Sequence, residues 1–143
     1  MPLSKKTAES NILRERVLKT TRGLQRVTYA KSQEIIDEVI ERRLSSIHFS
    51  MKPVYNTNIK VNGKVIVDNI WGKVKVFYIG KQEKSSEDFL VNTLLHEELE
   101  ARIAYRALSL KAKKYQAMLN KDKSTHAYIN SVIAKYFRMR GWK

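Results

Sequence analysis

The stretch from Ile59 to Gly80, IKVNGKVIVDNIWGKVKVFYIG, decides the fold, because its apolar and polar residues alternate. Alternation with a period of two is typical of a β-strand that has one buried face. The pair Asn62-Gly63 favours a type I′ hairpin turn, and Trp71-Gly72 supplies a second turn. With Val54 as the start of a first strand, the pattern predicts three strands in an antiparallel meander that ends at Gly80.

Two helices are predicted before these strands. Apolar residues at helical spacing favour a helix over residues 8–22, and Gly23 follows where a helix commonly ends. A second helix is expected from Ser32, which is a plausible N-cap. Its apolar face recurs at intervals of three and four residues: Ile35, Ile36, Val39, Ile40 and Leu44.

Two more helices are predicted after the strands. Ser85 or Ser86, followed by Glu87 and Asp88, is a favourable helix start, and the apolar pattern then continues to about Met118. An amphipathic helix from near Ser124 to Gly141 would place five apolar residues on one face: Ile129, Val132, Ile133, Tyr136 and Phe137. The expected fold class is therefore α+β, and 143 residues suit a single domain.

The charge of the chain points to a polyanionic partner. Twenty-eight Lys and Arg residues against fourteen Asp and Glu leave a net charge of +14. The excess is concentrated between residues 101 and 143, where 11 basic residues meet one acid, Asp122. We expect nucleic acid as the partner, RNA rather than DNA, bound through the basic C-terminal third.

Several classes of protein are excluded by composition. The chain has no cysteine, so disulfides and thiolate metal sites are ruled out. The longest apolar runs are far too short to span a bilayer, and the residues after Lys5 and Lys6 do not form a secretory signal. We expect a soluble protein that makes no membrane contact and acts in the cytoplasm.

One segment carries the candidate chemistry, Leu94-Leu95-His96-Glu97-Glu98-Leu99-Glu100-Ala101-Arg102, which puts three carboxylates beside a histidine. On a helix, His96 and Glu100 share one face. In a metal-free nuclease, Glu97 or Glu100 would take a proton from the nucleophile, His96 would return one to the leaving group, and Arg102 would hold the phosphate. This chemistry requires no cofactor.

Two other interpretations of this segment stay open. It could be an exposed helix in which Glu98 and Arg102 form an ordinary ion pair. It also nearly repeats the zinc-protease pattern H-E-x-x-H, with Glu100 in place of the second histidine. A metal-dependent hydrolase would need a third ligand, and only His48 and His126 remain to supply it.

Residues outside this segment are expected to assist it. His126, near the start of the last helix, could be a second imidazole for proton transfer, although a surface histidine is the more common case. Basic residues around one aromatic are expected to bind phosphates and to stack a base: Lys111, Lys113, Lys114, Tyr115, Lys121, Lys123, Lys135 and Arg138.

The order of elements, the high positive charge and the His96–Arg102 segment resemble the C-terminal cytotoxic nuclease domains of bacterial polymorphic toxins of the contact-dependent inhibition or Rhs type. The resemblance covers most of the chain and rests on architecture and charge. It implies cleavage of RNA or DNA in a target cell and a cognate acidic immunity protein. The competing class is a non-catalytic nucleic-acid-binding or ribonucleoprotein component, for which the same charge would serve.

Overall fold

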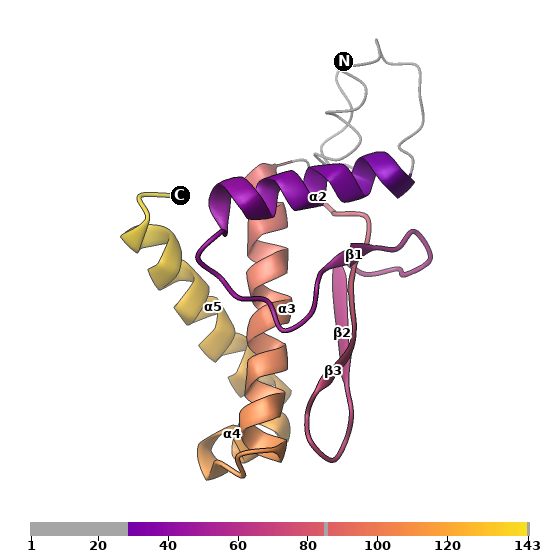
Figure 1. Ribbon diagram of the computed structural model, residues 1–143. Coiled ribbons are helices and arrows are strands. Elements are labelled where there is room, and N and C mark those ends of the chain that lie inside the picture. Colours follow the sequence, from indigo (N-terminus) through magenta and orange to yellow (C-terminus); the bar gives the residue numbers. More distant parts are fainter. Residues whose placement is uncertain (1–28, 85, 143) are drawn as a thin grey trace.

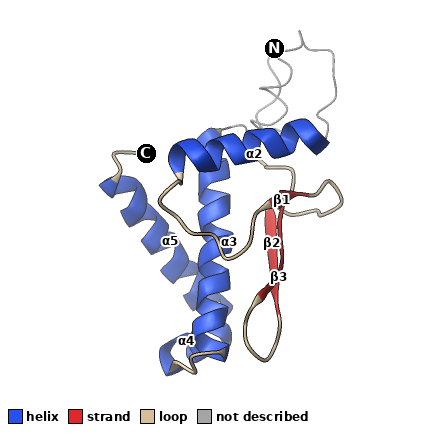
Figure 2. Cartoon of the chain, in the orientation of Figure 1, coloured by secondary structure: helices blue, strands red, loops and turns tan. Residues whose placement is uncertain are grey.

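The computed structural model describes residues 29–84 and 86–142, and the predicted helix over residues 8–22 lies outside them. The described chain forms four helices and a three-stranded sheet, so the α+β class is confirmed. Figure 1 shows α3 (Glu87–Leu108) in the middle of the molecule, with the strands on one side and α5 (Asp122–Met139) on the other. Figure 2, in the same orientation, shows that helices make up most of the regular structure and that the strands form a small part.

The first described helix, α2, spans Tyr29–Arg43 and crosses near the N-terminal end of α3 (Figure 1). Its predicted apolar face is confirmed, because Ile36, Val39 and the following Leu44 are fully buried. The N-cap prediction is wrong. The helix begins three residues before Ser32, and that serine is itself fully buried inside the helix.

The sheet contains β1 (Val54–Tyr55), β2 (Gly63–Val67) and β3 (Val74–Ile79) in the order β1-β3-β2. β2 and β3 form the predicted antiparallel pair, but β1 pairs with β3 in parallel, so the all-antiparallel meander is wrong. This prediction failed because Asn62-Gly63 is not a hairpin turn between β1 and β2. The pair lies at the start of β2, and β2 does not pair with β1. The Gly80 amide donates to the Asn62 carbonyl at 2.9 Å, which fixes the crossing of the chain to the far edge of β3.

The second turn, between β2 and β3, lies where the sequence predicts it. Gly72 has a φ of +67°, a conformation that favours glycine. The Asp68 carboxylate accepts hydrogen bonds from the backbone N–H groups of Ile70, Trp71, Gly72 and Lys73. A Cβ at Gly72 would also lie 2.7 Å from the carbonyl oxygen of Ala104. The turn is therefore fixed against α3.

The helix α3 is the longest in the described part of the chain, and Ser86 caps it as predicted, accepting from the Phe89 amide at 3.0 Å. The prediction that it continues to about Met118 is wrong. It ends at Leu108, and a separate helix, α4, spans Lys113–Leu119. Between them Lys111 adopts a φ of 57°, and the Ala112 amide bonds back to the Arg106 carbonyl. Neither glycine nor proline marks this break.

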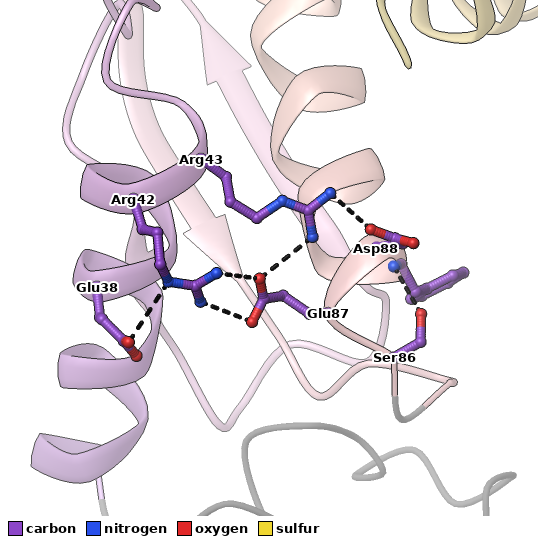
Figure 3. Close-up of polar contacts among 7 residues, drawn as sticks. Glu38, Arg42, Arg43, Ser86, Glu87 and Asp88 are labelled. Carbon is purple, nitrogen blue, oxygen red and sulfur yellow. Dashed lines mark hydrogen bonds and ion pairs between the residues drawn. The ribbon is translucent and has the colours of Figure 1, made fainter. Parts of the chain in front are cut away.

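Two arginines of α2 join it to the start of α3 (Figure 3). Arg42 binds both carboxylate oxygens of Glu87, at 2.8 and 2.7 Å. Arg43 contacts Glu87 at 3.2 Å and Asp88 at 2.6 Å. Both acids lie in the first turn of α3, where negative charge also complements the helix dipole.

The last helix, α5, confirms its predicted apolar face, since Ile129, Ile133 and Phe137 are buried. The Thr125 hydroxyl donates to the carbonyls of Met118 and Lys121, which fixes the first turn of α5 against the end of α4. His126 follows directly. No helix in the described part of the chain combines the length and apolar character needed to cross a membrane.

Candidate functional site

Three side chains from two helices meet beside α3. His96 and Glu100 lie one turn apart on α3, with His96 Nε2 3.4 Å from Glu100 Oε2. His126 reaches the same oxygen from α5, with its Nε2 at 3.5 Å. The two imidazole rings stack with their centroids 5.3 Å apart. The structure therefore brings together three of the residues that the sequence singled out.

The spacing of this group suits a metal ion. The ligand atoms of His96, Glu100 and His126 all lie within 4.8 Å of one another. Bond lengths of about 2.0–2.1 Å around a tetrahedral zinc place neighbouring ligand atoms about 3.3–3.4 Å apart. The two nitrogen–oxygen distances are close to that edge length. The third ligand that the His96–Glu100 motif lacks would come from His126 on α5.

The group is open on one side. The side chains of His96, Glu100 and His126 are 22%, 31% and 44% exposed. Catalytic zinc sites have three protein ligands and leave the fourth position for water or substrate. The exposure of these side chains leaves room for such a fourth ligand.

Glu97 lies next to the group but in a different environment. It is 8% exposed, and this burial is the main reason why its pKa rises to about 8. It shares a side-chain hydrogen bond with Glu100 and accepts one from the backbone of Val65 in β2. A Cβ at Gly63 would lie 2.8 Å from the Glu97 Cγ. The glycine that the sequence suggested for a hairpin turn instead makes room for this carboxyl.

The titration of the other two α3 residues follows from their contact. The hydrogen bond to Glu100 is the main cause that raises the pKa of His96 above its ordinary value. Burial opposes the ionisation of Glu100, yet the hydrogen bond and the positive charge of His96 bring its pKa below the ordinary value. The pKa shifts of the two neighbouring carboxyl groups therefore run in opposite directions: burial favours the neutral form of Glu97, and contact with His96 favours the charged form of Glu100.

Arg102 does not join this group. Its Nε donates to Glu98 at 2.8 Å and its Nη2 donates to the carbonyl oxygen of His48 at 2.8 Å. Glu98 is 2% exposed and also accepts from the amide and the hydroxyl of Ser50. The Glu98–Arg102 pair predicted for an exposed helix exists, but its carboxylate is buried and ties α3 to the loop before β1.

The predicted basic surface is distributed over α4 and α5. Lys111, Lys113, Lys114 and Lys121 are exposed around α4, Lys135 and Arg138 are exposed on α5, and Lys123 lies in the first turn of α5. Tyr115 is half-buried, and the charged groups of Arg106 and Lys114 lie 5.4 and 5.6 Å from its ring centroid.

Sequence reasoning identified every member of the site but not its arrangement. The spacing of His96 and Glu100 predicts their shared face, whereas the contact with His126 depends on how α5 packs on α3. Comparison of the chain with models of protein families, with curated proteins and with solved structures found no match. The function therefore has to be argued from these residues.

Proposed function

We propose that the protein is a metal-dependent hydrolase with one metal ion held by His96, Glu100 and His126. The observation that carries the proposal is the convergence of these three ligand atoms, from two helices, at distances suited to one ion. Two imidazoles and one carboxylate form the ligand set of several zinc peptidases. The chain has no cysteine, so a thiolate site is not available to it.

Zinc suits this donor set best, because imidazole and carboxylate groups in a tetrahedral arrangement are its usual ligands. When bound, zinc would lower the pKa of a water molecule to about 7 and polarise the bond to be cleaved. The three protein ligands would hold the ion beside α3, and their partial exposure would let a substrate reach it.

Glu97 is the proposed general base. It follows the first ligand directly in the sequence, and its carboxyl lies within hydrogen-bond distance of the ligand Glu100. In H-E-x-x-H enzymes the glutamate at this position is the general base. In its ionised form, which the positive charge of a bound metal ion would favour, Glu97 would take a proton from the attacking water and deliver it to the leaving group, so that water adds across the cleaved bond and no proton is lost.

The ligand set and the adjacent glutamate favour a peptide bond as the substrate. The charge of the chain favours a second candidate, a nuclease that acts on RNA or DNA, because 11 of the last 43 residues are basic and one is acidic. The predicted toxin activity and an acidic immunity protein as partner belong to this second candidate. Arg102 is not required in either case, since it pairs with Glu98.

The test uses the purified full chain, dialysed against a chelator and then reloaded with zinc. Each form is incubated with total RNA, with plasmid DNA and with unfolded casein. The variants are His96→Ala and His126→Ala, and His48→Ala is the matched control. His48 is the one remaining histidine of the chain, and it contacts Arg102 through its backbone carbonyl.

We expect cleavage of one substrate that is abolished by the chelator, restored by zinc and lost in both site variants but not in His48→Ala. The substrate that is cleaved distinguishes the peptidase from the nuclease. Cleavage that survives the chelator but not His96→Ala would replace the metal site by the metal-free acid/base mechanism. Cleavage that survives both site variants, or no cleavage of any substrate, would contradict the proposal.

A further inference from the structure

A pocket of about 490 Å³ lies on a different face of α3 from the histidine group. Its walls come from the loop before β1, the turn between β2 and β3, the second half of α3 and the segment that follows it. Along a helix with 100° per residue, Arg102 in this wall is about 200° from Glu100 in the histidine group. None of the three proposed metal ligands lines this pocket. It is therefore a separate site.

The pocket is positively charged. Nine described residues line it, and three of them are basic and none is acidic. These basic residues are Lys73, Arg102 and Arg106. The carboxylate of Glu98 compensates the charge of Arg102 from behind, which leaves a net charge of about +2 at the wall. An anionic ligand fits such a wall.

The guanidinium groups of Arg102 and Arg106 and the backbone of Lys73 have contacts within the protein before any ligand binds. Arg102 is fixed by Glu98 and by the His48 carbonyl, is 35% exposed, and has no hydrogen-bond partner for its Nη1 among the described residues. The guanidinium of Arg106 lies 5.4 Å from the ring centroid of Tyr115. The backbone of Lys73 belongs to the turn fixed by Asp68. Donors ordered in advance lose less entropy when a ligand binds.

Apart from Ser50, the rest of the lining is mostly apolar. Ala101 and Gly72 in this lining are buried, and Tyr105 and Leu110 line the pocket as exposed side chains. An exposed tyrosine ring beside a cluster of cations can stack a planar group whose negative charge lies on the cations. The volume is within the range of about 300–1,000 Å³ that is common for small-ligand sites.

We propose that this pocket binds one nucleotide unit, with its phosphate on Lys73, Arg102 and Arg106 and its base against Tyr105 and Leu110. The nucleotide is either free or one unit of a single strand. The proposal does not depend on the metal site, because the two share no residue. It does give the chain a phosphate-specific contact in addition to its exposed lysines.

The experiment measures binding to the full chain in the presence of a chelator, so that no hydrolysis contributes. The probes are adenosine monophosphate, inorganic phosphate and a five-nucleotide single-stranded RNA, each followed by titration calorimetry. The variants are Arg106→Ala, Lys73→Ala and Tyr105→Leu. Lys75→Ala is the matched control, because Lys75 is exposed on β3 next to the same turn but does not line the pocket.

We expect saturable binding of at least one nucleotide probe that weakens about tenfold in Arg106→Ala and in Lys73→Ala and is unchanged in Lys75→Ala. Tyr105→Leu should weaken the nucleotide probe and leave the affinity for inorganic phosphate unchanged. If the RNA binds and the mononucleotide does not, the ligand of the pocket is one unit of a single strand and not a free nucleotide. Equal affinity in Arg106→Ala and the wild type, equal losses in the Lys75→Ala control, or no binding of any probe would overturn the proposal.

Discussion

Glu97 and Glu98 are neighbours on α3, are both buried, and have different roles in this account. Glu97 faces Glu100 and β2, and Glu98 is bonded to Arg102 and Ser50. Glu97→Gln should lower hydrolysis about a hundredfold or more and leave stability nearly unchanged, because only the proton transfer is lost. Glu98→Gln should lower the free energy of unfolding by about 1–3 kcal/mol, because charged hydrogen bonds are lost from a buried group.

The two variants are compared by initial rates of hydrolysis and by urea denaturation. Each serves as the control of the other, since both make the same chemical change one residue apart. A Glu98→Gln variant that loses activity but keeps its stability, or a Glu97→Gln variant that remains fully active, would rule out these roles.

Gly63 provides the space that Glu97 occupies. In Gly63→Ala the new Cβ would lie 2.8 Å from the Glu97 Cγ and 3.0 Å from the Thr93 Cγ2, so that either the strand or the carboxyl has to move. We expect a stability loss of about 1–3 kcal/mol and a clear loss of hydrolysis. Lys64→Ala, at the next and exposed position of β2, should change neither quantity. An unchanged rate in Gly63→Ala would show that the position of Glu97 does not matter.

At the residue scale, the sequence predicted correctly that His96 and Glu100 share one face of a helix. Both lie on the same helix, so helical geometry alone sets their distance. The sequence could not show that His126 lies beside Glu100, because the two residues are on different helices. This contact depends on the α3–α5 packing and on Thr125, whose hydroxyl joins the first turn of α5 to the end of α4. A metal interpretation therefore stayed an alternative until the two helices were placed.

At the scale of the elements, the stability that the contacts of Arg42 and Arg43 with Glu87 add between α2 and α3 should depend on pH. The hydrogen bonds from Arg42 are the main cause that holds the pKa of Glu87 below its ordinary value of 4.5. A folded-state pKa below the unfolded one adds stability above about pH 4.5, and this stability is lost as the pH falls through the folded-state pKa. For a partly exposed pair the contribution is about 0.5–1 kcal/mol.

Unfolding by urea at pH 7, 5 and 3 measures this contribution. Glu87→Gln should lower the stability at pH 7, and this effect should become smaller as the pH falls toward the lowered pKa of Glu87. Glu83→Gln, at an exposed acid outside the contact, is the control. A loss in Glu87→Gln that is the same at all three pH values would show that the ion pair is not its source.

The elements also show where sequence patterns stop being informative. Helical periodicity depends on residues close together in the chain, and it predicted α2, α3 and α5. Strand pairing depends on residues far apart in the chain. The Asn62-Gly63 pair was therefore interpreted as a hairpin turn. In the structure it belongs to the segment that crosses to β2, where the Gly80 amide and the Gln82 side chain donate hydrogen bonds to the Asn62 carbonyl. The end of α3 was missed because the residue with a positive φ there is Lys111.

For the whole molecule, the charge of +14 predicts salt-sensitive binding to nucleic acid through α4 and the segment before it. Changing the exposed Lys111, Lys113 and Lys114 together to Glu should weaken RNA binding at least tenfold and should make the dependence of affinity on salt less steep. Fluorescence anisotropy at several salt concentrations measures both quantities. If affinity and salt dependence survive this triple change, the contact surface lies elsewhere.

If α3 and α5 together hold one metal ion, the chain binds one ion per molecule, which an analysis of bound metal measures. The full chain is loaded with zinc, dialysed and analysed for zinc per chain, beside His126→Ala, Glu100→Gln and the control His48→Ala. We predict about one bound zinc for the wild type and the control, and a large loss of affinity in both site variants. A chain that holds no zinc, or a His126→Ala variant that binds it as tightly as the wild type, would contradict the account.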